Sequence, residues 1–218
     1  MNIALFGGTF DPIHSGHLRV AEEAARKYCL DRILFVPAGN PPHKVGNHLT
    51  PFEHRYVMVS LVCAGKRRFV PSLLEAPDGS GRPNYTIATV RKVRKSLGRK
   101  DQLFFLIGLD AFLDLPSWKS FRQLLDMVNF IVVSRPGYSN REIAKVVPQN
   151  MIRGSRHGSG RDTITLRRTK IHILRGVDVP AASREIRQAI ENKKPVTGLV
   201  PPVVEEYLLK EGIYRAER

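Results

Sequence analysis

Two histidines three positions apart, His14 and His17, end the stretch GGTFDPIHSGH at residues 7–17. If a helix begins here, positions i and i+3 share one of its faces, so both imidazoles can point at the same spot. That spot also receives the unpaired backbone N–H groups and the positive dipole end of the helix. These features together predict a site for the phosphates of a nucleotide.

The elements that would position this pair can also be predicted from the sequence. The apolar run Asn2–Phe6 predicts a buried strand. Gly7 and Gly8 follow it and would let the backbone pass close to a ligand, because neither residue carries a Cβ. We expect Ser15 to cap the helix and Gly16 to leave its surface open.

A metal site and a purely structural role are the alternatives for the pair. Two histidines can form half of a metal site, but no third His, Cys or carboxylate cluster lies nearby in the sequence. Histidines packed in a core beside a glycine turn are the structural alternative. That role suits a single histidine better than a pair flanking a glycine after a strand, so we expect no protein-bound metal here.

Several short apolar runs bounded by turn residues predict strands, and segments of helical period lie between them. The predicted strands are Asn2–Phe6, Arg32–Val36, Phe69–Leu74, Leu103–Ile107, Phe130–Val133 and Lys170–Leu174. The predicted helices are His17–Tyr28, Pro51–Ala64, Tyr85–Leu97, Phe121–Met127, Ser183–Asn192 and Pro202–Lys210.

This alternation predicts an α/β fold with one doubly wound, mostly parallel sheet that carries helices on both faces. Ligands of such sheets bind outside the carboxyl ends of the strands, which is where the histidine motif falls. At 218 residues we expect a single domain over residues 1–218, with its C-terminal helices from about residue 183.

Composition is that of an ordinary globular protein, with 42% hydrophobic and 25% charged residues. We expect a cytoplasmic protein, because no signal peptide or membrane-spanning run is apparent and because Cys29 and Cys63 suggest buried, reduced thiols. The 35 Lys and Arg against 20 Asp and Glu give a formal net charge of +15, which favours polyanionic partners without selecting one.

A nucleic-acid-binding protein is therefore the alternative from another functional class. The basic run Arg91–Lys100 and the segment Gly154–Arg168 would form its footprint. No helix-turn-helix, zinc-finger or RNA-binding signature accompanies them, so we expect no specific nucleic-acid partner. Gly154–Arg168 is rich in Gly, Ser and Arg, and we interpret it as a mobile basic connection within the domain.

The motif GGTFDPIHSGH, with its HxGH signature, resembles the nucleotidyltransferase superfamily and, in its full form, the bacterial nicotinate-nucleotide adenylyltransferase family. The resemblance continues in the same order through PAGNPPHK, RPNYTIATV, FLIGLDAFLDLPSWKSF and FIVVSRPG, and so covers almost the whole chain. AASREIR, residues 181–187, stands where the family usually has ISSTxIR. Ala182 and Arg184 depart from that pattern and remove one or two hydroxyl contacts to the triphosphate.

The resemblance implies adenylyl transfer from ATP to nicotinate mononucleotide, which yields nicotinate adenine dinucleotide and pyrophosphate in NAD biosynthesis. It implies that His14 and His17 are catalytic through charge stabilisation and hydrogen bonding, and that Mg²⁺ arrives with ATP. We expect Ser183 to cap its helix, with Arg187 on the same face as a second phosphate clamp. The ATP-binding residues expected on this basis are Gly7, Gly8, Thr9, Phe10, His14, His17, Gly108, Asp110, Ser183 and Arg187.

For the acceptor, Lys44 and Arg135 follow successive strands and are expected to reach the mononucleotide phosphate. Trp118 is expected to stack on the pyridine ring. The N–H groups at Tyr85 and Thr86 begin a helix and suit the nicotinate carboxylate. Nicotinamide mononucleotide or another phosphorylated acceptor such as phosphopantetheine remains the alternative, and the oligomeric state is not determined by these patterns.

Overall fold

The computed structural model describes residues 1–41, 49–134, 140–156, 162–177 and 182–215. Within these ranges eight strands form one sheet in the order β3-β2-β1-β4-β5-β8-β7-β6. The strands are β1 (Asn2–Gly8), β2 (Arg32–Pro37), β3 (Phe69–Pro71), β4 (Gln102–Gly108), β5 (Asn129–Val133), β6 (Ile152–Arg156), β7 (Thr163–Leu166) and β8 (Lys170–Leu174). All neighbours from β3 to β8 are parallel, whereas β7 and β6 add an antiparallel end.

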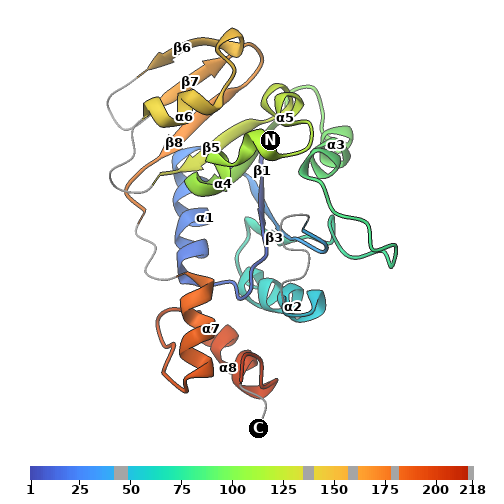
Figure 1. The fold of residues 1–218 in the computed structure, drawn as a ribbon, viewed down its shortest axis with the longest axis vertical. Helices are drawn as coiled ribbons and strands as arrows, with labels where there is room; N and C mark the ends of the chain where they lie inside the picture. Colours follow the sequence, from blue (N-terminus) through green and yellow to red (C-terminus); the bar gives the residue numbers. More distant parts are fainter. Residues whose placement is uncertain (42–48, 135–139, 157–161, 178–181, 216–218) are drawn as a thin grey trace.

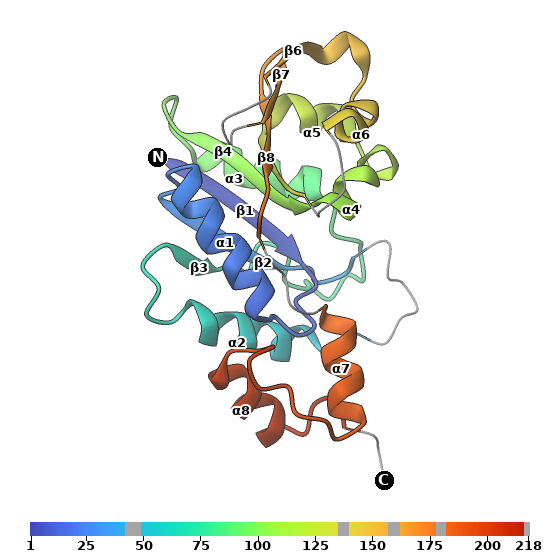
Figure 2. The same cartoon turned by 90° about the vertical axis from the view of Figure 1, so that its left-hand side faces the viewer.

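Helices cover both faces of this sheet (Figures 1 and 2). One core contains residues of α1 (Ser15–Lys27), α2 (Phe52–Cys63), α7 (Ser183–Glu191) and α8 (Pro202–Lys210). The other contains residues of α3 (Thr86–Ser96), α4 (Leu109–Leu113), α5 (Phe121–Met127) and α6 (Asn140–Val146). The predicted doubly wound α/β fold is therefore confirmed.

The side chains of β1 show how the sheet divides these two cores. Ala4 and Phe6 belong to the core on the α1 side, whereas Ile3 and Leu5 belong to the core on the α3 side. Alternate residues of a strand point to opposite faces, so a run that is apolar at every position is buried on both sides. This explains why Asn2–Phe6 reads as continuously hydrophobic.

The order of the strands reverses between β1 and β4. From β1 the chain proceeds outward to β2 and β3, and it then returns to place β4 on the other side of β1. The connections that leave the carboxyl ends of β1 and β4 therefore diverge to opposite faces, and sheets of this kind bind their ligands at such a point. The histidine motif follows β1, so it lies at this switch point.

The structure corrects the interpretation of Gly154–Arg168 as a connection. Its described residues include parts of β6 and β7, which pair antiparallel and extend the sheet beyond β8. Ile164 and Leu166 are buried within the α3-side core. The alternation in TITL, residues 163–166, is a strand pattern that the surrounding Gly, Ser and Arg obscure. Residues 157–161 lie outside the described part.

Most predicted elements are present with shifts of a few residues at their ends. The sequence interpretation missed the short helices α4 and α6 in addition to β6 and β7, and Phe69–Leu74 is a strand only over Phe69–Pro71. Cys63 is buried as expected, and burial raises the pKa of its thiol to about 12. Cys29 is exposed, contrary to expectation, because α1 ends just before it. Both cysteines are free.

None of the described helices combines the length and apolar character needed to cross a bilayer. The C-terminal helices α7 and α8 lie together at one end of the molecule, and β6, β7 and α6 lie at the other (Figure 1). Helix α8 packs on α2, where the phenolic oxygen of Tyr207 lies 2.7 Å from Nδ1 of His54.

Candidate active site

The helix after β1 begins differently from the sequence prediction. His14, not Ser15, is the N-cap of α1, in an extended conformation with φ −141° and ψ 171°. The backbone N–H of His14 donates to Nδ1 of His17 at 3.2 Å. Ser15 instead donates through its hydroxyl to the carbonyl of Gly198. The prediction of a Ser15 cap was wrong, because the backbone around Leu199 and Gly198 binds Ser15 and a histidine takes over its capping role.

The two imidazole rings lie against each other, with centroids 3.7 Å apart and planes inclined by 33°. Because Nδ1 of His17 accepts the backbone N–H, its ring hydrogen belongs on Nε2. His14 is only 5% exposed, and its buried Nδ1 has no hydrogen-bond partner within the described residues. The orientation of the His17 ring is therefore fixed by a hydrogen bond, whereas Nδ1 of His14 is buried with its hydrogen-bonding capacity unused.

Both histidines are neutral at pH 7 in the absence of ligand. Burial lowers the pKa of His14 to about 4, although Glu185 partly opposes the shift. Burial, together with the neighbouring His14, lowers the pKa of His17 well below its ordinary value. An anion at the pair would oppose both shifts, because it stabilises the protonated forms. An anion bound at this pair would therefore favour proton uptake by the imidazoles.

The residues between β1 and the histidines support the pair from beneath. Phe10 is buried in a left-handed conformation, and its ring packs edge-on against His17 and Phe6 at centroid distances of 5.1 and 5.6 Å. A Cβ at Gly8 would lie 3.2 Å from the Phe10 ring, so a larger residue would displace that ring. A Cβ at Gly7 would make ordinary contact with Phe105 at 3.6 Å.

Within the motif, the carboxylate of Asp11 is buried and contacts residues from the C-terminal part of the chain. Tyr214 donates to its Oδ1 at 2.6 Å. Nη1 of Arg187 donates to the Asp11 carbonyl at 2.6 Å and lies 3.9 Å from Oδ2. Burial and the adjacent Asp11 raise the pKa of the Tyr214 phenol, which therefore stays protonated. These contacts bring Arg187 to the histidine loop from 176 residues away.

Helix α7 docks on the same loop, but not through the predicted cap. Ala182 is the N-cap, and its backbone N–H donates to Oε2 of Glu185 at 2.9 Å. Ser183 occupies the next position and donates its hydroxyl to the carbonyl of Pro12 at 3.0 Å. The prediction of a Ser183 cap was wrong, because Glu185 satisfies the helix start and frees the serine to reach the loop. That Ser183 and Arg187 lie on one helix face is confirmed by their shared loop.

On the neighbouring strand, Gly108 ends β4 and is the N-cap of α4. A Cβ at Gly108 would meet nothing within 4 Å, so open space lies beside it. Asp110 is exposed in the first turn of α4. Since β4 lies beside β1, both residues stand at the same switch point as the histidine motif.

Trp118 and Tyr85 lie on the α3 side of the sheet and share its core. The ring of Trp118 is perpendicular to that of Phe105, with centroids 6.2 Å apart, and Phe105 is also the neighbour of Gly7. The ammonium of Lys119 lies 4.2 Å from the centre of the Tyr85 ring. The sequence analysis did not single out Lys119, which follows the only tryptophan in the sequence. Thr86 is the first residue of α3.

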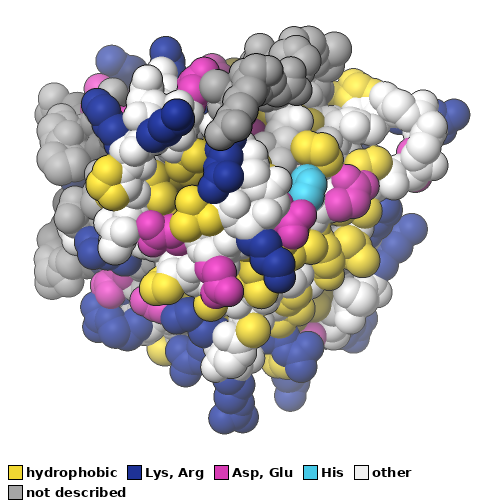
Figure 3. Space-filling view, turned by 90° about the horizontal axis from the view of Figure 1, so that it is seen from below, with side chains coloured by type: hydrophobic (Ala, Val, Ile, Leu, Met, Phe, Trp, Pro, Cys, Tyr) yellow, Lys and Arg dark blue, Asp and Glu magenta, His cyan; other side chains and the backbone are white. Residues whose placement is uncertain are grey.

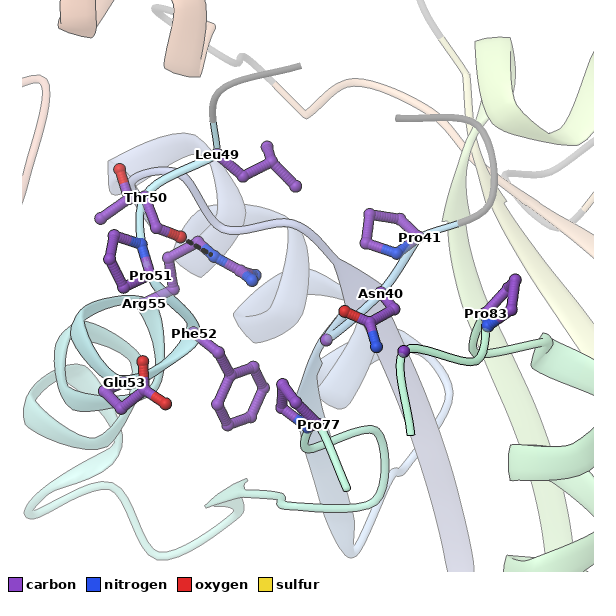
Figure 4. A pocket seen from close by; sticks show the side chains of 12 residues that line it. Asn40, Pro41, Leu49, Thr50, Pro51, Phe52, Glu53, Arg55, Pro77 and Pro83 are labelled. Atoms are coloured by element: carbon purple, nitrogen blue, oxygen red, sulfur yellow. Dashed lines mark hydrogen bonds between the residues drawn. The ribbon is translucent and has the colours of Figure 1, made fainter. Parts of the chain in front are cut away.

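Lys44 and Arg135 lie outside the described residues. Beside the gap that contains Lys44, a pocket of about 420 Å³ opens between the loop after β2 and the start of α2 (Figure 4). Asn40 and Pro41 line one side, and Thr50 and Phe52 line the other. Asn40 is fixed by Asn84, whose Oδ1 accepts its backbone N–H at 2.7 Å.

No group of three or more His, Cys, Asp or Glu in the described part of the chain is arranged to hold a metal ion. The one buried carboxylate within the motif, that of Asp11, is bound by Tyr214 and faces Arg187. Protein groups therefore already engage this carboxylate.

Comparison of the sequence with known proteins shows similarity over its full length. Residues 5–157 match the family model described as cytidylyltransferase-like. A probable nicotinate-nucleotide adenylyltransferase of Desulfotalea psychrophila is 37% identical, covering 97% of this chain and 99% of the relative. A protein of the same name from Thermus thermophilus is 40% identical, covering 99% of this chain and all of the relative.

Solved structures show the same fold at lower identity. Plasmodium falciparum nicotinic acid mononucleotide adenylyltransferase complexed with NaAD superposes with a TM-score of 0.73. It is 20% identical, and the match covers 98% of this chain and 97% of that one. A second structure of that protein, complexed with APC, gives a TM-score of 0.72.

Proposed function

The chain belongs to the nicotinate-nucleotide adenylyltransferase family, and from this premise we propose that it transfers the adenylyl group of ATP to nicotinate mononucleotide. The products are nicotinate adenine dinucleotide and pyrophosphate. The observation that carries the proposal is the pair His14 and His17, fixed ring to ring at the switch point of the sheet, where such sheets bind nucleotides.

In the proposed reaction an oxygen of the acceptor 5′-phosphate forms a bond to the α-phosphorus of ATP. The bond from that phosphorus to the bridging oxygen of the β-phosphate breaks, and its electron pair leaves with pyrophosphate. Such a transfer between anions needs alignment and charge stabilisation more than a protein nucleophile. The two imidazoles supply hydrogen-bond donors, and their pKa values rise as the phosphates bind.

The ATP site in this proposal extends from the histidines to both neighbouring elements. Gly7, Gly8 and Thr9 bring backbone close to the nucleotide, and Gly108 with Asp110 borders it from β4. Phe10 contributes through its backbone, since its ring is buried beneath His17. Ser183 and Arg187 approach from α7, and Arg187 can stabilise phosphate charge while it holds the Asp11 carbonyl. Mg²⁺ enters as part of the MgATP substrate.

The acceptor lies on the α3 side in this proposal. Trp118 offers a flat surface for the pyridine ring, and the first turn of α3 at Tyr85 and Thr86 offers backbone N–H groups to its carboxylate. Lys119, held over the Tyr85 ring, adds a positive charge that favours the acid over the amide. Lys44 and Arg135 remain predicted contacts of the mononucleotide phosphate.

Pyrophosphate release from MgATP tests the function directly. We expect fast release with nicotinate mononucleotide and much slower release with nicotinamide mononucleotide or phosphopantetheine in separate reactions. The product should be identified as the dinucleotide by mass. Preference for either of the other acceptors would overturn the acceptor assignment, and no release with any of them would overturn the reaction.

We propose no specific nucleic-acid partner, because phosphorylated substrates already account for basic residues around the switch point. Figure 3 supports this for one face, at the end of the molecule that bears α7 and α8, where acidic side chains are interspersed among Lys and Arg. Salt-sensitive retention on DNA by a protein with no ATP turnover would contradict this assignment. The whole chain acting as one domain is part of the same proposal.

A further inference from the structure

The side chain of Arg55 in α2 is 1% exposed, although it carries a charge. Burying a guanidinium is costly unless its donors are satisfied, and no described carboxylate forms an ion pair with it. Its recorded hydrogen bonds all go to backbone carbonyls instead. Burial correspondingly lowers the pKa of Arg55, with Asp11 as the first of several opposing charges.

Those carbonyls belong to three separate segments. Nη1 donates to the carbonyl of Thr9 at 2.8 Å and to that of Ala38 at 2.7 Å. Nε donates to the carbonyl of Thr50 at 2.8 Å, the bond drawn as a dashed line in Figure 4. Thr9 follows β1 and leads to the histidines, and Ala38 follows β2. One rigid planar group therefore connects the ends of two neighbouring strands.

The acceptor-binding loop begins at Ala38, and its residue Asn40 donates its backbone N–H at 2.7 Å to Oδ1 of Asn84, the residue before Tyr85 in the proposed acceptor site. Arg55 thus holds this loop at Ala38, and it holds the histidine loop at Thr9 with the same nitrogen. Another backbone bond, from the N–H of Ala38 to the carbonyl of Gly8, joins the two loops at 2.9 Å.

We propose that Arg55 is a positioning residue that sets the distance between the ATP-binding loop and the acceptor-binding loop. This inference rests on the proposed function, because it assigns one substrate to each loop. In-line transfer requires the two reacting phosphates to be held close and aligned, and a misplacement of about 1 Å can lower the rate about 10²-fold. In this inference Arg55 acts through the backbone that it holds and not by contact with the reacting phosphates.

The decisive variants are Arg55→Lys and Arg55→Ala, with Val62→Ala as a matched control. Arg55→Lys keeps the charge but lacks the fork that bridges Thr50 to the other two carbonyls. Val62 is a buried residue of the same helix, 4% exposed, and its truncation lowers stability without touching either loop. Active-site concentration is measured by MgATP binding, and kinetics are run well below the lowest melting temperature.

We expect kcat per ATP-binding site to fall about 10²-fold in Arg55→Lys. KM for each substrate should change only a few-fold, and Val62→Ala should keep wild-type kcat and KM. Added methylguanidinium at millimolar concentration should increase kcat of Arg55→Ala at least about tenfold, whereas methylammonium should leave it unchanged. A merely structural arginine would show neither the loss of kcat per folded site nor this selective rescue.

Wild-type kcat per site in Arg55→Lys overturns the inference even if Arg55→Ala fails to fold. A loss matched by Val62→Ala at equal stability overturns it as well. Failure of the proposed function is seen separately, because it appears as absent turnover in the wild-type protein with nicotinate mononucleotide. In that case the assignment of Arg55 falls with the function on which it rests.

Discussion

Nδ1 of His17 accepts the backbone N–H of His14, the residue three positions before it, and the two rings lie with centroids 3.7 Å apart and planes inclined by 33°. The bond also fixes the tautomer of His17, so that its donor is Nε2–H. The spacing of the pair therefore does two things, since it caps the helix and presents a donor of defined direction.

The first prediction concerns this donor. In His17→Ala we expect kcat to fall about 10²- to 10³-fold, the usual cost of removing one preorganised donor from a transition state. The affinity for nicotinate mononucleotide should change little, because that substrate is proposed to bind on the α3 side. Steady-state kinetics and calorimetry provide the two numbers.

His172→Gln is the matched control for that variant. His172 lies on β8, and its ring contacts that of Tyr28, the residue that follows α1 at the end opposite His14 and His17. Its replacement should therefore leave kcat unchanged. A His17→Ala enzyme with normal kcat but weakened acceptor binding would refute the role assigned to His17.

The low pKa of His14 predicts how stability depends on pH. The folded pKa is about 4 and lies below the ordinary value of 6.5, so the unfolded chain binds more protons between these values. The free energy of unfolding should therefore decrease as the pH falls from 6.5 to about 4, and the His14 contribution should then stop changing. The whole shift amounts to roughly 3 kcal/mol.

Urea unfolding of wild-type protein and His14→Gln at several pH values checks this prediction. Carboxylates titrate in the same range, so the informative quantity is the difference between the two proteins. The free energy of unfolding should decrease more on acidification in the wild-type protein than in His14→Gln. Parallel curves would contradict the burial-driven shift.

Polyphosphate binding should reverse these pKa shifts. The phosphates of ATP stabilise the protonated imidazoles, so the protein should take up protons on binding and bind MgATP more tightly as the pH falls through the pKa of the complex. Calorimetry in two buffers of different ionisation enthalpy measures the uptake near pH 6.5. His14→Gln should take up fewer protons, and equal uptake would exclude His14 from the phosphate site.

Trp118 provides an intrinsic signal for the acceptor. It is the only tryptophan, it is partly buried, and its ring meets Phe105 edge-on with its faces perpendicular to that ring. Stacking by the pyridine should change its fluorescence on titration with nicotinate mononucleotide. Trp118→Ala should raise KM for the acceptor about two- to tenfold, in line with roughly 0.5 to 1.5 kcal/mol for an aromatic pair. An unaltered KM would show that the pyridine ring does not bind at Trp118.

Tyr214→Phe tests how the C-terminal segment is fastened. Removal of the phenolic hydroxyl leaves Oδ1 of the buried Asp11 without that donor, and we expect a loss of about 1–3 kcal/mol in the free energy of unfolding. Tyr207→Phe removes the hydroxyl that contacts His54 in a partly exposed position and should cost less. Equal losses in the two variants would show that the Asp11 contact has no special weight.

Much of the fold could be predicted because its strands are continuously apolar and its helices are periodic. Lys170–Leu174, Phe121–Met127 and Pro202–Lys210 have the predicted bounds. The short strands β6 and β7 were missed because their pattern is brief and lies among Gly, Ser and Arg. Their place in the sheet depends on the pairing of β7 with β8, and local sequence patterns do not specify which strands pair.

The two predicted caps failed for a common reason. Ser15 and Ser183 are good capping residues by type, but each hydroxyl is bound to a carbonyl in a segment that is 183 or 171 positions away along the chain. Intrinsic preference for a cap is worth about 1 kcal/mol, so one tertiary hydrogen bond can displace it. Cys29 was expected to be buried because its sequence context looks helical and apolar, whereas α1 ends at Lys27 and Cys29 has a positive φ of 50°.

The sequence by itself determined the chemistry and its place, because a strand, two glycines and two spaced histidines form a local unit that carries its own geometry. Only the tertiary structure decided which distant residues contact that unit. Arg187 and Tyr214 reach Asp11 from nearly the other end of the chain, and Arg55 collects carbonyls from three loops. Backbone carbonyls are present at every residue, so the sequence cannot mark which ones a buried arginine will bind; folding alone brings them together.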